Sequence, residues 1–383
     1  MDQAIACYKK AIALDPKLAD AHSNLGTLLC DVKKDYDGAI ACFHQAMELD
    51  PQSAKIPFNL GNALRNKGQV DQAIAWYQKA IELDPKYAAA HYNLGNVLSR
   101  NGQMDKAMAS WRKTIAVDPN FTQAHFSLGL ALYGKGQVDE AIVCFKKAIA
   151  LDPKAPMAHG ALGEALLGQG RYAEARNASA RALALLPENH PLRRPAAGQV
   201  EACERMLKLE ERLPRLLRGE EKASSAQESL DLARMCQLKR MHAAAARFAA
   251  EAFAADPKRA SDLRARLRYN AACSAALAAA RQGEDAAKLD GAAQRKLRAQ
   301  ALECLKADLT AWGQLLDSGP PQARPFIVQT LSHWQKDSDL AGIRDKAALS
   351  ELPDEEQKAF TLLWAHVTEL LKKAETTAQK DGK

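Results

Sequence analysis

The chain has few aromatic residues, no closely paired cysteines and no long hydrophobic run. Aromatic residues make up 6% of its 383 residues, and Ala-rich stretches are frequent, which suits close helix packing. Its eight cysteines include no CxxC pair, so we expect reduced core thiols in a cytoplasmic protein. The longest charge-free Ala-rich run, Tyr269–Ala280, is far shorter than the ~20 residues that span a bilayer. No signal peptide is visible, and we expect no membrane partner.

The chain does have a period. A proline, a glycine and an alanine each return every 34 or 35 residues, at Pro16, Pro51, Pro85, Pro119, Pro153 and Pro187, at Gly26, Gly61, Gly95, Gly129 and Gly163, and at Ala4, Ala39, Ala73, Ala107, Ala141 and Ala175. This interval is typical of a helix-turn-helix repeat. One repeat cannot bury its apolar face alone, so repeats stack into a curved solenoid with a concave surface. We therefore predict an all-α solenoid that binds a polypeptide in its concave groove and is not an enzyme.

The repeat array is predicted over residues 1–189. A half repeat fills 1–18, and the five complete repeats of 19–189 are 19–53, 54–87, 88–121, 122–155 and 156–189. Each complete repeat has a first helix, A, and a second helix, B. In the repeat of 54–87, Gly61 should let the two helices approach, and Gly68 should end helix A in the left-handed conformation. Asp71 should cap helix B, and Pro85 should prevent it from continuing. The one additional residue of 19–53 is assigned to a longer turn between the helices.

The period breaks after Pro187. Residues 190–225 are predicted to be a linker and a charged helix, with a kink or break at Pro214. Residues 226–317 are predicted to be degenerate repeats, because Ala233, Ala245 and Pro257 keep the spacings of the array. The last of them has an insertion at 284–296 and a helix B at 301–312. Residues 318–383 should form a helical C-terminal cap, with helices centred near Gln329 and Leu363.

The run NLGNALRNKGQVDQAIAWYQKAIELDP in residues 59–85, echoed in the neighbouring repeats, resembles the tetratricopeptide repeat. The resemblance implies a right-handed superhelical solenoid with helix A on the concave side, followed here by a divergent helical region. NLGNAL and HYNLGNVL, in residues 54–121, are similar to the repeats in the substrate arm of O-linked N-acetylglucosamine transferases. That transferase's catalytic domain has no room in the helical sequence that follows residue 189.

Segments of residues 200–370, among them RYNAACSAALAAARQGEDAAKLD and HWQKDSDLAGIRD, resemble the C-terminal region of planctomycete serine/threonine protein kinases that carry these repeats. The resemblance implies a bacterial protein with a kinase domain upstream of Met1. A start on helix B, with Ile5, Tyr8 and Ile12 lacking a helical partner, agrees with that expectation. The chain has no Gly-rich phosphate loop, HRD or DFG motif, so we expect no kinase activity and no cofactor. The alternative function is therefore a regulatory or substrate-recruiting fragment of such a kinase.

Helix A carries asparagines beside the repeat glycine. Asn24, Asn59 and Asn93 stand just before it, and Asn62 and Asn96 follow it. Residues three apart share a helix face, and a side-chain amide can hold both an N–H and a C=O of a peptide backbone. We predict that these five asparagines bind an extended peptide, in a row that ends at Ser127 and Ala161. The alternative is that the asparagines cap or bridge neighbouring helices.

Two further sets share repeat positions on helix A. Phe58, Tyr92 and Phe126 are predicted to anchor a peptide, and the alternative is packing between repeats. His22, His91, His125 and His159 also share one position. Stacked helices lie ~8–10 Å apart, whereas zinc needs each imidazole within ~2.1 Å, so we expect no metal site from these histidines.

The segment 234–268 holds nine basic and three acidic residues. It is predicted either to contact an acidic partner or to present a solvated face. Nucleic acid is the less favoured partner, because no regular basic stripe accompanies the aromatic residues. His333, Trp334 and Trp364 are interpreted as part of the core of the capping helices.

Overall fold

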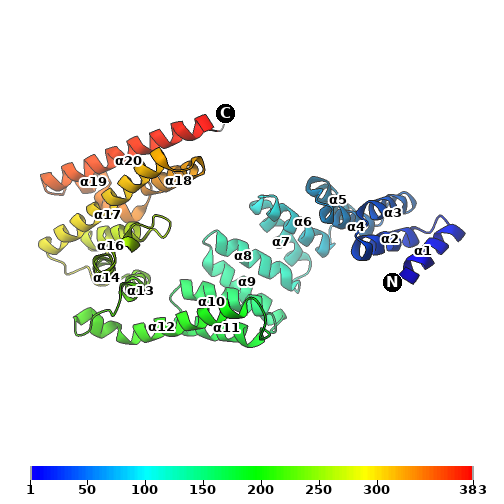
Figure 1. The fold of residues 1–383 in the computed structure, drawn as a ribbon, viewed down its shortest axis with the longest axis horizontal. Coiled ribbons are helices and arrows are strands. Elements are labelled where there is room, and N and C mark those ends of the chain that lie inside the picture. The colour runs from blue at the N-terminus through cyan, green and yellow to red at the C-terminus, as the bar shows by residue number, and fades with distance from the viewer. Residues whose placement is uncertain (1, 382–383) are drawn as a thin grey trace. The chain divides into compact units, whose positions relative to one another are not determined.

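The structure is a computed structural model that describes residues 2–381. Within these residues it has twenty α-helices and no strand, which confirms the all-α class (Figure 1). The chain divides into two compact units, the first ending at Cys203 and the second beginning at Glu204. None of the helices in residues 2–381 combines the length and the apolar character that crossing a bilayer requires.

The first unit is a series of helix pairs. The A helices are α2 (Ala19–Leu28), α4 (Lys55–Asn66), α6 (Ala88–Arg100), α8 (Thr122–Gly134) and α10 (Pro156–Gly168). The B helices are α3 (Tyr36–Leu49), α5 (Val70–Leu83), α7 (Met104–Val117), α9 (Val138–Leu151) and α11 (Tyr172–Leu185), and α1 (Asp2–Leu14) precedes them all. Each A helix packs against its own B helix, and each of α3, α5, α7 and α9 packs against the next A helix. Helix α2 also contacts α4, and α8 contacts α10, as expected for A helices on the inner side of such a stack.

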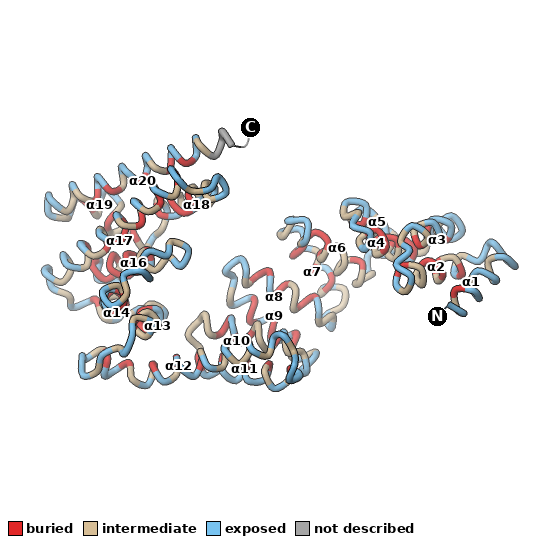
Figure 2. The backbone as a smooth tube through the Cα atoms, in the orientation of Figure 1, coloured by how far each residue is buried: buried red, intermediate tan, exposed pale blue. Residues whose placement is uncertain are grey.

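The repeat glycine marks the closest approach of helices A and B. A Cβ atom added to Gly26, Gly61, Gly95 or Gly129 would lie 2.6–2.9 Å from an atom of an aromatic ring on helix B. The four rings are those of Phe43, Tyr77, Trp111 and Phe145, and all are buried. Only glycine leaves room for a ring at this distance, which confirms the role predicted for Gly61. Buried residues recur along both helices of these pairs (Figure 2).

The turn between the helices follows the prediction at Gly68 and differs from it at Asp71. Gly68 has a φ of +86°, in the left-handed region that glycine adopts without strain. Helix α5 begins at Val70 after Gln69, so Asp71 lies in the first helical turn and is not the cap. A carboxylate there still interacts favourably with the helix dipole. In other repeats the aspartate at the position of Asp71 contacts a residue of the next repeat, as Asp37 does in its ion pair with Lys67.

The additional residue of the 19–53 repeat is not in a longer turn. It is taken up by a π-helical segment, Leu29–Lys33, that continues α2. A π-helical turn accommodates one more residue than an α-helical turn, so the exit of the helix keeps its direction. Lys34 follows with a φ of +57° and occupies the left-handed position held by glycine in the other repeats.

The first helix, α1, contacts α2. Ile5 is buried, whereas Tyr8 and Ile12 are half-buried. Helix α2, the first helix of the following repeat, packs against α1 and buries Ile5. The expectation that these residues lack a helical partner is therefore wrong for Ile5.

Helix α12 (Arg193–Arg218) contains the unit boundary and runs through Pro214 without a break. Proline removes one helical hydrogen bond, but the buried residues Leu209, Leu213 and Leu216 keep the same face of the helix against its neighbours on both sides of Pro214. The expected break is therefore wrong.

The second unit continues with α13 (Ala226–Leu238), α14 (His242–Ala255), the short α15 (Pro257–Ala260), α16 (Leu267–Ala279) and α17 (Gly291–Ser318). It ends with α18 (Arg324–Trp334), η3 (Ser338–Ile343), α19 (Lys346–Leu349) and α20 (Asp354–Asp381). Helix α17 begins ten residues before the predicted helix B, because the Asp290 side chain accepts a hydrogen bond from Ala293 N and starts the helix inside the expected insertion. The helices expected near Gln329 and Leu363 are α18 and α20.

Candidate functional site

Two surfaces are candidates for binding, one in each unit. The first is the row of asparagines on the A helices of the first unit. All five side chains are half-buried, and they lie on α2, α4 and α6. Asn62 and Asn93 are brought into direct contact, since Asn93 Nδ2 donates to Asn62 Oδ1 at 2.9 Å. Asn24 and Asn59 make no side-chain hydrogen bond within the described residues.

The asparagines that follow the glycine have an internal role. Tyr77 Oη donates to Asn62 Oδ1 at 2.8 Å, and Trp111 Nε1 donates to Asn96 Oδ1 at 3.1 Å. An indole N–H can only donate, so the orientation of the Asn96 amide is determined: its oxygen faces the ring and its NH2 group is left for another partner. Asn62 is fixed in the same way, because Tyr77 and Asn93 fill both acceptor sites of its oxygen.

The sequence carries a signal for this pairing that the spacing of the asparagines alone does not reveal. Asparagine follows the repeat glycine only where helix B carries Tyr77 or Trp111. Where the ring is Phe43 or Phe145, the residue after the glycine is Thr27 or Leu130. A buried hydroxyl or N–H needs an acceptor, and a phenyl ring does not.

We predict that Asn96→Ala lowers the free energy of unfolding by about 1–3 kcal/mol, because the indole N–H of Trp111 is left buried without a partner. Trp111 is 4% exposed, so water does not replace the lost amide. Asn59→Ala, which removes no internal hydrogen bond, should change stability by less than about 0.5 kcal/mol. Urea unfolding of both variants measures the difference. Equal stabilities of the two variants would show that the Asn96–Trp111 hydrogen bond contributes nothing.

The three aromatic residues on helix A also contact other rings. Phe58 lies 4.9 Å from Tyr87, and Tyr92 lies 4.9 Å from Phe121, between ring centroids. Tyr87 and Phe121 precede the A helix of the following repeat. Phe126 lies 6.0 Å from Phe145 of its own repeat. These contacts give the rings a packing role, and each ring is still half-exposed at the surface of helix A.

The histidines of helix A are each bonded to the backbone. In His22, His91, His125 and His159 the ring Nε2 lies 2.9–3.1 Å from the carbonyl oxygen of the repeat proline six residues earlier. The repeated position is thereby explained by a contact that ties helix A to the preceding loop.

The eight cysteines all lie within the described residues and none is in a disulfide, and five of them are buried. Cys42 and Cys144 are half-buried, and burial raises the pKa of both thiols. Cys7 is exposed, so the expectation of a core thiol is wrong at that position, because α1 packs mainly against one helix, α2.

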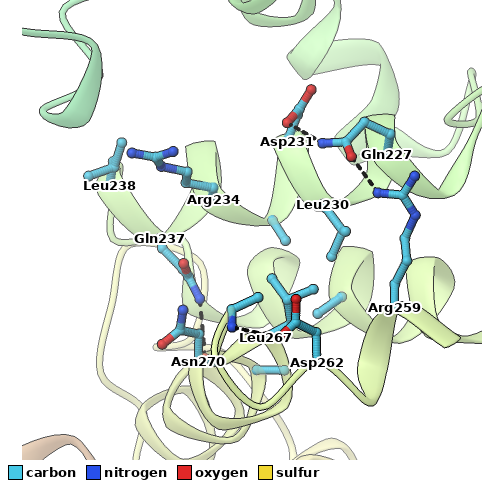
Figure 3. A pocket seen from close by; sticks show the side chains of 14 residues that line it. Gln227, Leu230, Asp231, Arg234, Gln237, Leu238, Arg259, Asp262, Leu267 and Asn270 are labelled. Carbon is cyan, nitrogen blue, oxygen red and sulfur yellow. Dashed lines mark hydrogen bonds between the residues drawn. The ribbon is translucent and has the colours of Figure 1, made fainter. Parts of the chain in front are cut away.

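The second candidate surface is a pocket of about 670 Å³ in the second unit, between α13 and the segment that leads into α16 (Figure 3). Asp231 and Arg234 line it from α13, with Asn270 opposite. Since Ala233 occupies the position of Gly61, Asp231 and Arg234 take the places of Asn59 and Asn62. The inner face of this repeat is thus charged where the first unit has amides.

Most charges in this pocket are paired. Asp231 accepts hydrogen bonds from Gln227 at 3.0 Å and from Arg205 at 3.3 Å. Asp262 accepts from two backbone N–H groups, and Arg259 bonds to Gln227 and Asp256. Arg234 has no ion pair or side-chain hydrogen bond within residues 2–381. The pocket therefore offers an unpaired guanidinium beside carboxylates that already accept hydrogen bonds from the chain.

The basic residues of the segment 234–268 fall into two groups, those that are paired with an acidic residue and those that are not. Arg268 is paired with Asp308, Lys239 with Glu210, and Arg247 with Glu251 and the end of α12. Arg234, Arg240, Lys258, Arg264 and Arg266 have no ion pair among the described contacts. Trp334, by contrast, is core, as predicted: it is 1% exposed and stacks on Tyr269 at 5.3 Å. Trp364 is half-buried, and its Nε1 donates to Ile343 O at 2.7 Å. His333 is exposed, so the interpretation as core is wrong for that residue.

Comparison with known proteins places the repeats in a family. Models of the tetratricopeptide repeat match residues 1–30 and 61–102, 33–81, 88–121 and 126–191. No curated protein matches the chain by sequence.

Several solved structures are similar to part of the chain. A crystal structure of MamA is 38% identical over 40% of this chain and 89% of its own, with a TM-score of 0.37. YrrB, whose structure is titled as that of a TPR protein with an unusual peptide-binding site, is 25% identical over 48% of this chain and 93% of its own, with a TM-score of 0.40. TTC0263, a thermophilic TPR protein of Thermus thermophilus, is 25% identical over 48% of this chain and 98% of its own, with a TM-score of 0.37. The family models and the helix pairs of the first unit together identify the N-terminal half of the chain as tetratricopeptide repeats built into an all-α solenoid.

Proposed function

We propose that this protein is a non-catalytic scaffold that binds an extended peptide or partner protein along the A helices of its first unit. The observation that carries the proposal is the row of half-buried amides on that face, two of which, Asn24 and Asn59, have no hydrogen bond of their own in the described structure. A polar group in such a place is available to a ligand without first breaking an internal contact.

The hydrogen bonds from Tyr77 and Trp111 determine which amide groups of the asparagine row can meet a ligand. Asn62 and Asn96 turn their oxygens toward Tyr77 and Trp111 and present NH2 groups, which donate to peptide carbonyls. Asn24 and Asn59 can both donate and accept. The proposed ligand therefore meets a face rich in donors, with Phe58, Tyr92 and Phe126 supplying apolar contact. None of the eight cysteines, all of which the structure describes, is in a disulfide, which supports a cytoplasmic location for this interaction.

The experiment is a pull-down from cell lysate with the full chain and with an Asn24→Ala/Asn59→Ala variant. Neither substitution removes an internal hydrogen bond, so circular dichroism and melting should be unchanged while captured partners fall at least fivefold. The matched control is Gln72→Ala/Gln78→Ala, which removes two exposed amides from helix α5 on the opposite side of the repeat. Partners that are captured equally by all three proteins would exclude the asparagine row as their binding site.

We further propose that an acidic segment of a partner binds the pocket of the second unit through Arg234, the unpaired guanidinium at its wall. Arg234→Gln should weaken binding of a fluorescent poly-glutamate peptide about fivefold to tenfold, the loss of one charge-assisted hydrogen bond. Lys258→Gln, which removes an exposed charge that does not line the pocket, should have less than a twofold effect. Affinity that does not change between low and high salt would contradict an acidic partner.

The second candidate function is the regulatory or substrate-recruiting part of a bacterial serine/threonine kinase. It is supported by the sequence resemblance of residues 200–370. A genomic reading frame that continues upstream of Met1 through a kinase domain would support this candidate, and an in-frame stop codon directly before Met1 would contradict it.

A further inference from the structure

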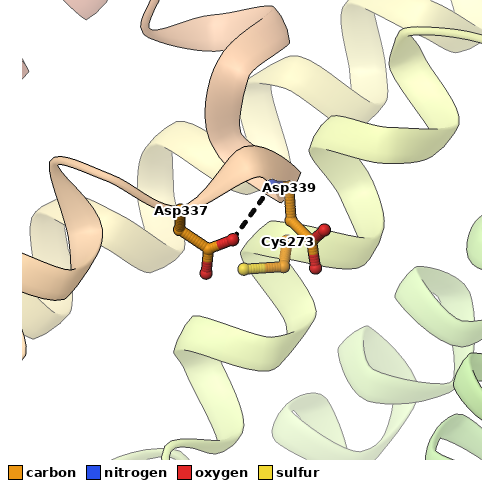
Figure 4. A group of neighbouring side chains, drawn as sticks. All are labelled: Cys273, Asp337 and Asp339. Carbon is orange, nitrogen blue, oxygen red and sulfur yellow. Dashed lines mark hydrogen bonds between the residues drawn. The ribbon is translucent and has the colours of Figure 1, made fainter.

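Three side chains that can bind a metal converge in the second unit, outside both candidate binding surfaces (Figure 4). Cys273 lies on α16, and Asp337 and Asp339 lie at the start of η3. One ligand atom of each, the cysteine sulfur and a carboxylate oxygen of each aspartate, lies within 4.8 Å of the other two. Cys273 is 7% exposed, and both aspartates are half-buried. They line one pocket of about 350 Å³ together with His242, the first residue of α14.

Asp337 is held in position by groups outside this cluster. The Tyr269 hydroxyl donates to its Oδ2, and the His333 ring lies 3.2 Å from the same oxygen. Its Oδ1 accepts from the backbone N–H of Asp339 at 2.9 Å. Tyr269 is fixed in turn by its stack on Trp334. Ligating carboxylates in metal sites are oriented by outer hydrogen bonds of this kind.

The cluster has polar groups that the chain itself does not satisfy. The Asp339 carboxylate accepts no hydrogen bond within residues 2–381. His242 Nδ1 is buried without a hydrogen-bond partner. A thiol, two carboxyls and an unpartnered imidazole nitrogen thus share one cavity, and a divalent cation would satisfy all of them.

We propose that Cys273, Asp337 and Asp339 bind a zinc-class divalent ion, with His242 as the fourth ligand. Thiolate, imidazole and carboxylate are the ligands of Zn²⁺, whereas Ca²⁺ and Mg²⁺ take oxygen ligands alone. At metal–ligand bonds of about 2.0–2.3 Å, tetrahedral ligand atoms lie roughly 3.5 Å apart. The widest separation among Cys273, Asp337 and Asp339 must therefore close by about 1 Å, and the His242 ring, which lies outside this group of three in the same pocket, must turn toward the ion. Binding forms four coordinate bonds and releases the thiol proton, with any carboxyl proton, to solvent.

The ion would connect three elements that are far apart in the sequence. Cys273 is on α16, His242 begins α14, and the aspartates precede the last two helices of the chain. With His242 as the fourth ligand, protein would fill all four metal positions, which is the arrangement of a structural site. Its role would be to hold the C-terminal helices against α14 and α16.

Cobalt titration of the full chain tests the site, because Co²⁺ takes the place of zinc and absorbs light when a thiolate binds it. We expect one equivalent of Co²⁺ to produce a thiolate-to-metal charge-transfer band together with the visible bands of tetrahedral cobalt. Cys273→Ser should remove the charge-transfer band. Cys304→Ser is the matched control, because Cys304 is also buried in this unit and has Asp308 nearby, but Asp308 is already paired with Arg268.

Asp339→Asn keeps the shape of the side chain and tests the site if Cys273→Ser fails to fold. It should leave the melting temperature of the metal-free protein within a few degrees and abolish the increase that Zn²⁺ produces in the parent protein. His242→Ala should weaken Zn²⁺ binding at least tenfold. The absence of a charge-transfer band in the parent protein, or its persistence in Cys273→Ser, would overturn the site, and unchanged affinity in His242→Ala would overturn the fourth ligand.

Discussion

Replacing Arg268 by methionine is expected to lower the free energy of unfolding by about 3–5 kcal/mol. Arg268 Nε on α16 donates to Asp308 Oδ1 on α17 at 2.5 Å, and the two side chains are 16% and 5% exposed. Methionine leaves the Asp308 carboxylate buried without its partner, and the penalty for an uncompensated buried charge is larger than the net contribution of the intact pair. Urea unfolding followed by circular dichroism measures the loss.

The double variant Arg268→Met/Asp308→Leu separates the buried charge from the packing. It removes both charges and should recover most of the stability lost in the single variant. A double variant that is less stable than Arg268→Met would show that the side-chain shapes, and not the unpaired carboxylate, determine the cost.

The same pair predicts a dependence on pH. Burial raises the pKa of Asp308, and Arg268 opposes the shift. A carboxyl with a raised pKa in the folded state binds its proton more tightly there than in the unfolded chain, so its contribution to stability falls as pH rises through the interval between the two values. Arg268→Met removes the opposing charge and extends that interval upward. The variant should therefore lose more stability, relative to the parent, at about pH 7.5 than at about pH 5.

Gly129→Val is expected to cost about 3 kcal/mol or more in the first unit. A Cβ atom at Gly129 would lie 2.6 Å from Phe145 Cε1 and 3.2 Å from Cys144 Cβ, and the valine methyls would extend further into the same space. Phe145 is fully buried, so its ring can move aside only by displacing neighbouring core residues.

A glycine on the same helix provides the control. Gly134 has no atom within 4 Å of an added Cβ, so Gly134→Val should change stability by less than about 0.5 kcal/mol. Combining Gly129→Val with Phe145→Ala should restore part of the lost stability, because alanine at position 145 leaves room for the valine side chain. If both valine variants unfold at the same urea concentration, close helix approach is not the reason for the repeat glycine.

The first unit was largely predictable because its signals are local and repeated. Gly61 and Gly68 each act within one helix pair, through a close contact and a left-handed backbone conformation. Where a repeat departs from the pattern, the prediction made from the local sequence was wrong. The additional residue of 19–53 became a π-helical turn, since the buried face of α2 had to keep its register against α3.

The candidate site was predictable in part. The positions of the asparagines followed from the period, but their hydrogen bonds did not. Asn62 and Asn96 are oriented by Tyr77 and Trp111, and that pairing appears in the sequence only when residues of helices A and B are compared repeat by repeat. The proposal for Arg234 needed the pocket that α13 and the segment leading into α16 enclose.

The sequence by itself determined the helices, their pairing and the face on which the asparagines lie, because a 34-residue period encodes contacts between neighbours along the chain. Only the tertiary structure decided which amides remain free, which basic residues are already paired, and that Cys273 meets Asp337 and Asp339. These contacts join residues that are 15 to more than 60 positions apart in the sequence. No pattern within a single helix specifies such contacts, since they depend on how buried side chains share the space between packed helices.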